Sequence, residues 1–161
     1  MCPPEALPGA IKRIGLTAKV RAPRCREAVS ALLDWLGRRD LEVIMDLDTA
    51  ACVGLQGKYQ KSQIPSLVDL ILVLGGDGTF LSVARLVTDG RIPILGINVG
   101  GLGFLTEVTL DEMFPVLEKV FAGEFTLDER LMLTVHIHRQ GERIAQYVVL
   151  NDVVINKSAL A

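Results

Sequence analysis

The chain has 161 residues, half of them apolar, and a formal net charge of −2 at pH 7. This length and apolar content suit one domain, or a domain and a half, with a well-filled core. Without a basic excess, neither a nucleic acid nor a membrane surface is expected as a partner. The longest apolar run, around residues 70–74, is also far too short to span a bilayer.

The first segment, residues 1–10, contains three prolines and no apolar stretch of signal-peptide length, so we expect a loose leader. The cysteines, Cys2, Cys25 and Cys52, are odd in number and form no Cys-x-x-Cys pair. This pattern argues against a disulfide framework or a zinc site and indicates a reducing, cytoplasmic location.

Strands and helices alternate along the next part of the chain, which predicts a doubly wound α/β domain over residues 11–126 with a mostly parallel, Rossmann-like sheet. Strand patterns cover residues 11–17, 41–46, 67–74 and 92–98, and helical spacing of apolar side chains covers residues 24–38, 80–87 and 110–122. The third strand is apolar on both faces, as in the centre of a sheet covered by helices. Residues 49–66 show little periodicity and are interpreted as a mobile loop. Their lysines either face solvent, which we favour, or contact phosphate.

Near Phe125 the pattern changes to alternation over residues 131–138, followed by an Arg-Gln-Gly-Glu-Arg turn and a second apolar segment over residues 144–155. This pattern predicts an antiparallel hairpin. Since a lone hairpin is only marginally stable in water, we expect residues 127–161 to begin a β-rich second domain. His136 and His138 share one face of the first strand, but no carboxylate or cysteine nearby completes a set of metal ligands, so we expect no metal site.

The central strand ends in the sequence Gly-Gly-Asp-Gly-Thr, residues 75–79. In an open α/β sheet, ligands bind beyond the carboxyl ends of the strands. Glycines let a ligand approach the main chain closely, and the start of the following helix favours phosphate. Asp77 could accept a proton from a sugar hydroxyl or hold a magnesium ion that also carries phosphate. It could equally cap the helix, and these five residues leave both interpretations open.

A second glycine-rich turn, Gly-Ile-Asn-Val-Gly-Gly-Leu-Gly-Phe-Leu-Thr-Glu at residues 96–107, follows the next buried strand. Parallel strands would bring it to the same edge of the sheet. Phe104 either offers an aromatic face to a ring or packs in the core. Two glycine-rich turns at one edge favour a ligand site over turn chemistry alone.

The motifs at residues 75–80 and 96–107, followed by Leu-Asn-Asp-Val-Val-Ile at residues 150–155, together resemble the NAD kinase family. The resemblance covers nearly the whole chain after the leader. Gly-Gly-Asp-Gly-Thr by itself is not specific, because diacylglycerol- and sphingosine-kinase-like enzymes carry it and phosphofructokinases have a related turn. The other two motifs are those that single out NAD kinases.

The resemblance implies phosphoryl transfer from ATP, or in some members from polyphosphate, to the 2′-hydroxyl of the adenosine ribose of NAD, giving NADP. A magnesium ion would arrive with the nucleotide. Asp77 would be the base that activates the hydroxyl, Phe104 would lie near the adenine, and Asn151 and Asp152 would bind NAD from the β-rich domain. Without the resemblance, Asn151 and Asp152 are better explained as a strand-edge or turn pair. The other substrate-binding residues implied are Gly75, Gly76, Gly78, Thr79, Phe80, Leu81, Asn98, Gly101 and Leu105.

NAD kinases continue with a Gly-Ser-Thr-rich block, complete the β domain and commonly form dimers or tetramers. The resemblance therefore implies that this chain alone is a weakly active or inactive fragment and that the full-length form is a homo-oligomer. Two alternatives remain open. One is a lipid-kinase-like domain, supported only by residues 75–79, and the other is a nucleotide-binding module without catalysis.

Overall fold

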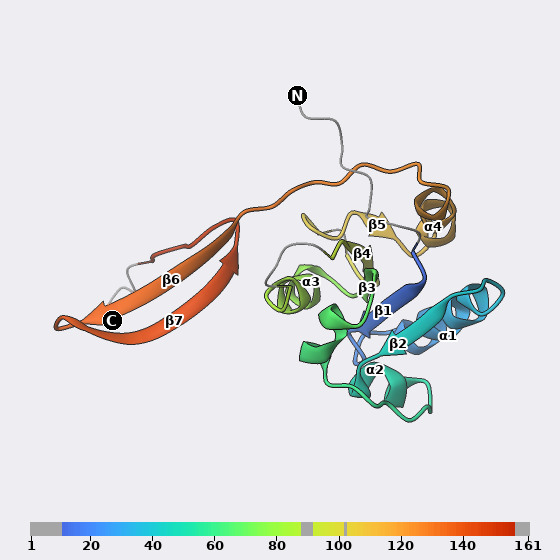
Figure 1. Ribbon diagram of the computed structural model, residues 1–161, viewed down its shortest axis with the longest axis horizontal. Helices are drawn as coiled ribbons and strands as arrows, with labels where there is room; N and C mark the ends of the chain where they lie inside the picture. The colour runs from blue at the N-terminus through green and yellow to red at the C-terminus, as the bar shows by residue number, and fades with distance from the viewer. Residues whose placement is uncertain (1–10, 88–91, 102, 157–161) are drawn as a thin grey trace. The chain divides into compact units, whose positions relative to one another are not determined.

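The computed structural model describes residues 11–87, 92–101 and 103–156. These residues form two compact units, one ending at Leu127 and the other beginning at Asp128. The first unit is built on a five-stranded sheet (Figure 1). In chain order the strands are β1 (Arg13–Ala18), β2 (Glu42–Met45), β3 (Leu70–Leu74), β4 (Ile94–Asn98) and β5 (Val108–Thr109). Every pairing is parallel, in the order β2-β1-β3-β4-β5, which confirms the predicted α/β class.

Helical elements cover both faces of this sheet, and each face has its own core. On one face α1 (Cys25–Leu36) and α4 (Met113–Phe121) pack against β1 and β3. On the other face the 3₁₀ helix η1 (Lys61–Ser66) and α3 (Asp77–Ala84) pack against β2 and β3. Because β3 contributes to both cores, all five of its side chains are buried, as predicted for a central strand.

The prediction of a mobile loop over residues 49–66 is wrong. The segment contains most of α2 (Leu47–Cys52) and the whole of η1. Asp46 caps α2, since its Oδ1 accepts a hydrogen bond from the Thr49 N–H at 2.9 Å. Ile64 is 1% exposed and anchors η1 to the sheet. Helices this short contain too few turns to produce a visible periodicity. The strand β5 was not predicted either, because two residues are too few to show alternation.

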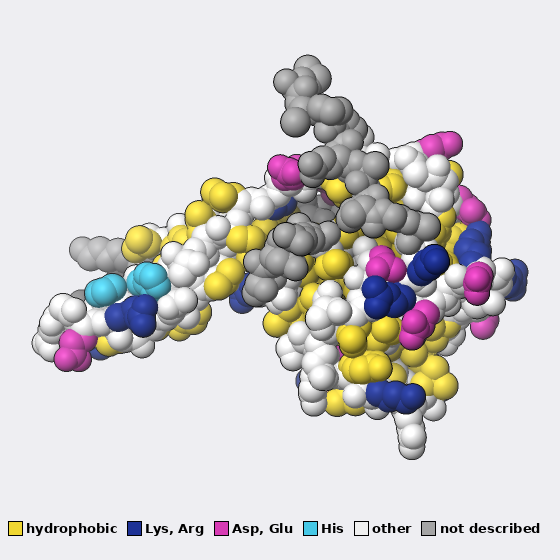
Figure 2. Space-filling view, viewed as in Figure 1, with side chains coloured by type: hydrophobic (Ala, Val, Ile, Leu, Met, Phe, Trp, Pro, Cys, Tyr) yellow, Lys and Arg dark blue, Asp and Glu magenta, His cyan; other side chains and the backbone are white. Residues whose placement is uncertain are grey.

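The second unit is the predicted antiparallel hairpin, formed by β6 (Met132–Arg139) and β7 (Glu142–Leu150). The two residues between them, Gln140 and Gly141, have φ angles of 51° and 85°, the positive values that a tight two-residue turn requires. Figure 2 shows the two histidines, coloured cyan, close together on this hairpin. Their ring centroids are 6.5 Å apart. Within the described ranges, no group of three or more His, Cys, Asp or Glu side chains could hold a metal ion.

Two further expectations concern the thiols and the membrane. Cys25 and Cys52 are free cysteines, whereas Cys2 lies outside the described residues. Burial and the neighbouring Cys52 raise the pKa of the Cys25 thiol to about 11, so it stays protonated at neutral pH. None of the helices in the described part of the chain has the length and apolar character to cross a membrane.

Leu72 lies at the centre of β3 and is fully buried. Replacing it by alanine should lower the free energy of unfolding by about 2–5 kcal/mol, because the lost contacts leave a cavity in the core between the sheet and the helices α1 and α4. The matched control is Leu55→Ala, at a side chain that is 52% exposed, where a change of less than about 0.5 kcal/mol is expected. Urea denaturation followed by circular dichroism measures both. Equal effects of the two substitutions would contradict the central placement of β3.

Candidate functional site

The two glycine-rich turns lie at the same edge of the sheet. Leu74 at the end of β3 pairs with Ile97 of β4, so residues 75–79 and 98–107 leave neighbouring strands side by side. The Gly75 N–H donates to the Ile97 carbonyl at 2.9 Å, which extends the pairing into the first turn. The expected meeting of the two motifs at the carboxyl edge is therefore present in the structure.

The carboxylate of Asp77 joins the two turns. Its Oδ2 accepts a hydrogen bond from the Phe104 N–H at 2.9 Å. Its Oδ1 accepts from the Leu105 and Thr106 N–H groups at 3.1 and 3.2 Å, and from the Thr106 hydroxyl at 3.1 Å. Asp77 is the first residue of α3, whose N-cap is Gly76. The interpretation of Asp77 as a helix cap is thus wrong, because its side chain binds the neighbouring loop.

These contacts fix the electrostatic state of Asp77. The hydrogen bond from the Phe104 N–H is the largest cause that lowers the pKa of the carboxyl, and the donors of Leu105 and Thr106 add to it against partial burial. The group is therefore ionised at neutral pH. A carboxylate oxygen has two acceptor positions, and Oδ2 uses one of them for the Phe104 N–H. Oδ2 thus keeps an acceptor position for a ligand hydroxyl.

Gly103 makes the close approach of the loop to Asp77 possible. A Cβ atom built at this position would lie 2.2 Å from Asp77 Oδ1 and 2.7 Å from the Thr106 hydroxyl oxygen. By contrast, a Cβ atom at Gly101 would meet nothing within 4 Å. Only one of these two glycines is thus required for packing.

The Asn98 side chain holds the second glycine-rich turn through hydrogen bonds. It is 4% exposed, and its Nδ2 donates to the Gly101 carbonyl at 2.7 Å and to the Thr106 hydroxyl at 3.0 Å. Its Oδ1 accepts from the Gly100 N–H at 2.8 Å. The described contacts make Asn98 a residue that shapes the loop, while its predicted contact with substrate stays a prediction.

The other predicted residues differ in exposure. The Phe104 side chain is 91% exposed, so core packing does not explain it. Phe80, a residue of α3, is partly buried and packs against the core on that face of the sheet, and Leu81 and Leu105 are half-buried. Gly75 fits closely over Thr79, since a Cβ atom there would lie 2.5 Å from the Thr79 hydroxyl oxygen.

Asn151 and Asp152 belong to the hairpin unit. Asn151 has a φ angle of 62°, and its N–H donates to the Leu131 carbonyl at 2.8 Å. Asp152 is exposed. This is the local geometry of a turn pair, and their predicted contact with NAD stays a prediction.

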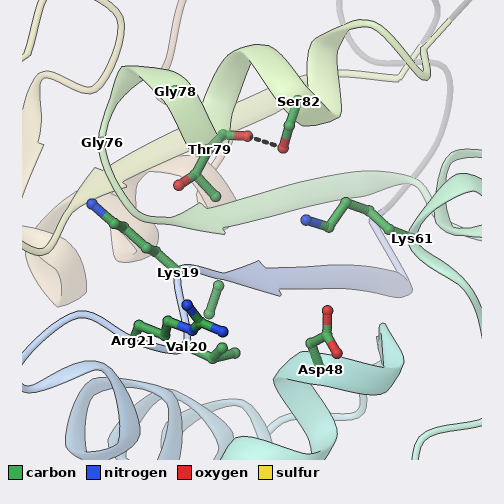
Figure 3. Close-up of a pocket in the computed structure, with 10 residues that line it drawn as sticks. Lys19, Val20, Arg21, Asp48, Lys61, Gly76, Gly78, Thr79 and Ser82 are labelled. Carbon is green, nitrogen blue, oxygen red and sulfur yellow. Dashed lines mark hydrogen bonds between the residues drawn. The ribbon is translucent and has the colours of Figure 1, made fainter.

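A cavity of about 440 Å³ opens at the carboxyl ends of β1 and β3 (Figure 3). The chain leaves β1 for β2 on one side, and β3 lies on the other, so this is the point where the strand order reverses and where α/β sheets bind ligands. Among the residues that line it are Lys19, Arg21, Asp48, Lys61, Gly76 and Thr79.

Sequence reasoning missed several of these residues. Thr106 makes two of the hydrogen bonds to Asp77, and only its place within the second motif pointed to it. Lys19 and Arg21 follow β1 directly, so the rule on carboxyl ends of strands could have identified them. Lys61 lies in the segment whose lysines were considered as phosphate contacts, but a position facing solvent was favoured for them.

Gly103→Ala tests the contact between the loop and Asp77. The added methyl group should push the loop from the carboxylate and lower the free energy of unfolding by about 1–3 kcal/mol, the cost of leaving buried polar groups unpaired. Gly101→Ala is the control and should change stability by less than about 0.5 kcal/mol. Thermal unfolding of the two variants under the same conditions makes the comparison, and similar melting temperatures would argue against the contact.

The lowered pKa of Asp77 predicts an acid-dependent contribution to stability. The contribution is fully present above the ordinary aspartate pKa of about 3.9 and is lost as the pH falls through the lower pKa of the folded state. Asp77→Asn should therefore flatten, in part, the fall of unfolding free energy as the pH drops below about 4. Urea titrations at several pH values measure this slope. The control Asp34→Asn, at an exposed position of α1, should run parallel to the original chain, and a parallel curve for Asp77→Asn would refute the assignment.

Comparison with known proteins identifies the family of this chain. The family described as the ATP-NAD kinase N-terminal domain matches residues 14–125. An NAD kinase from Geobacter sulfurreducens is 50% identical over 151 residues, covering 94% of this chain and 53% of the relative. One from Syntrophobacter fumaroxidans is 37% identical over 151 residues, with the same coverage. The chain thus spans about half the length of these curated relatives.

Solved structures show the same fold. A yeast NADH kinase complexed with NADH superposes with a TM-score of 0.75 at 21% identity, over 93% of this chain and 51% of that one. An NAD kinase from Archaeoglobus fulgidus in complex with ATP gives 0.56 at 21% identity, over 81% and 45%. Because the family match covers most of the sequence from β1 to the end of the first unit, this chain belongs to the NAD kinase family.

Proposed function

We propose that this chain provides the amino-terminal part of an NAD kinase that transfers phosphate from ATP to the 2′-hydroxyl of the adenosine ribose of NAD. The observation that carries the proposal is the ionised Asp77 carboxylate, fixed by four hydrogen bonds at the carboxyl edge of the sheet. Its Oδ2 retains an acceptor position, and the main chain at the neighbouring Gly76 and Gly78 is open to a ligand. The name of the relatives supplies NAD, and the description of the family supplies ATP.

Asp77 would bind and orient the ribose hydroxyl through Oδ2. A carboxylate with a lowered pKa is a weak base, so its main contribution is position rather than early removal of the proton. That suits phosphoryl transfer, whose transition state is loose and gains most from alignment and charge stabilisation. The proton passes to Asp77 as the new oxygen–phosphorus bond forms, while the bond between the γ-phosphorus and the bridging oxygen breaks and ADP leaves with that oxygen.

The exposed ring of Phe104 would contact the adenine of NAD, and the backbone that Gly76 and Gly78 leave open would face phosphate. A Cβ atom at either glycine would meet nothing within 4 Å, so a ligand can come close to the main chain at both positions. Asn151 and Asp152 would add contacts to NAD from the hairpin unit.

A magnesium ion bound to the donor phosphates would neutralise charge as it develops on the transferred group. Asp48 is the one carboxylate among the described residues that line the cavity. A single carboxylate suits an ion that keeps several waters and arrives with its nucleotide. Location in the cytoplasm and assembly of the full-length form into a homo-oligomer complete the proposal.

Formation of NADP from NAD and Mg-ATP tests the function. The 161-residue chain should be weakly active or inactive, whereas the chain joined to the carboxyl-terminal half of the Geobacter sulfurreducens relative should produce NADP. In the joined protein, Asp77→Asn should lower kcat about 10²–10⁴-fold. A folded joined protein that makes no NADP would refute the function. An undiminished rate for Asp77→Asn would refute only the role of Asp77.

A further inference from the structure

We propose that Thr106 is a positioning residue for the transfer reaction, because its hydroxyl fixes the Asp77 carboxylate so that Oδ2 is the oxygen that receives the ribose proton. This role rests on the proposed function, in which Asp77 accepts that proton. It extends the function by giving the two carboxylate oxygens different tasks and by naming the side chain that decides between them.

The two oxygens of the Asp77 carboxylate are not equivalent. Oδ1 accepts hydrogen bonds from the N–H groups of Leu105 and Thr106 at 3.1 and 3.2 Å and from the Thr106 hydroxyl at 3.1 Å. Among the described residues, Oδ2 accepts from the Phe104 N–H alone, at 2.9 Å. A carboxylate oxygen offers about two acceptor positions, so Oδ1 is fully occupied and Oδ2 is not. Oδ2 is therefore the oxygen that can meet a ligand hydroxyl.

The Thr106 hydroxyl donates to Asp77 because Asn98 occupies its acceptor side. Asn98 Oδ1 accepts from the Gly100 N–H at 2.8 Å, which identifies the other end of the amide as the donor. That donor, Nδ2, binds the Thr106 hydroxyl oxygen at 3.0 Å. A hydroxyl has a single proton to give, and the partner left for it is Asp77 Oδ1. The hydrogen bonds from Asn98 through Thr106 to Asp77 thus run in one direction.

Packing holds the Thr106 side chain in the orientation that this contact needs. Thr106 is 0% exposed. Its Cγ2 methyl group lies against Gly96 of β4, where an added Cβ atom would come within 2.8 Å of it. Since a side chain branched at Cβ has few χ1 rotamers, the methyl contact keeps the hydroxyl directed at Asp77. Valine would preserve this shape and lose the donor, whereas serine would preserve the donor and lose the methyl contact.

Loss of the Thr106 hydroxyl should change both the basicity and the alignment of Asp77. The Phe104 N–H is the largest cause of the lowered pKa of the Asp77 carboxyl, and the Thr106 hydroxyl lowers this pKa further. Without that hydroxyl, Oδ1 would regain an acceptor position and compete with Oδ2 for the ribose. A base assists only from the correct side of the attacking oxygen, so the second geometry is unproductive.

Carbon-13 NMR titration of the Asp77 carboxyl in the 161-residue chain tests the contact. Thr106→Val should raise the pKa of this carboxyl, because the carboxylate loses a donor, and Thr106→Ser should leave the pKa unchanged. The matched control is Thr17→Val. Thr17 is also 0% exposed, and its hydroxyl has no hydrogen-bond partner within the described part of the chain. An unshifted pKa in a folded Thr106→Val variant, or an equal shift in Thr17→Val, would overturn the inference.

Steady-state kinetics test the positioning role in the chain joined to the carboxyl-terminal half of the Geobacter sulfurreducens relative. Thr106→Val should lower kcat about tenfold and change the KM for NAD by less than about twofold, since alignment of the base matters most in the transition state. Thr106→Ser should restore most of the rate, and Thr17→Val should match the original protein. Equal losses of kcat in the two Thr106 variants would indicate a purely structural role and overturn the inference. The titration involves no turnover, so failure of the positioning role is distinguished from failure of the proposed function.

Discussion

The candidate site depends on one interaction, the binding of a backbone loop by a single carboxylate. Asp77 begins α3 at the end of β3, and the loop of residues 103–106 follows β4. Four hydrogen bonds converge on its two oxygens. Hydrogen bonds to an ionised carboxylate are strong, and here they fix both the Asp77 side chain and the loop. Without this contact the second glycine-rich turn would be held mainly by Asn98.

This arrangement explains why the glycines of the two turns differ in their structural roles. Gly103 is needed because the loop comes so close to Asp77 that no Cβ atom fits. Gly76 and Gly78 border open space and leave the main chain accessible. One glycine therefore serves packing, whereas the other two leave room for the proposed ligand, although the three look alike in sequence.

A second constraint is the close packing of η1 on β1 at Gly15. Gly15 allows Ile64 to pack directly on the sheet, and this contact positions η1 and, with it, Lys61. The two faces of the cavity thus have independent supports: the start of α3 on one side, and η1 on the other. One cavity is therefore lined both by the strand–turn–helix segment that begins α3 and by a basic side chain from a separate segment.

The sequence by itself determined the parallel sheet, the central place of β3, the hairpin and the meeting of the two glycine-rich turns. Each follows from apolar periodicity, which neighbouring residues show, or from the rule that the carboxyl ends of parallel strands meet at one edge of the sheet. The helices α2 and η1 were not predicted, because both are too short to show a period. Only the tertiary structure decided what Asp77 contacts, which glycine is needed for packing and where Lys61 lies. Those features depend on atoms that are far apart in sequence and approach each other only when the sheet and its two layers are assembled.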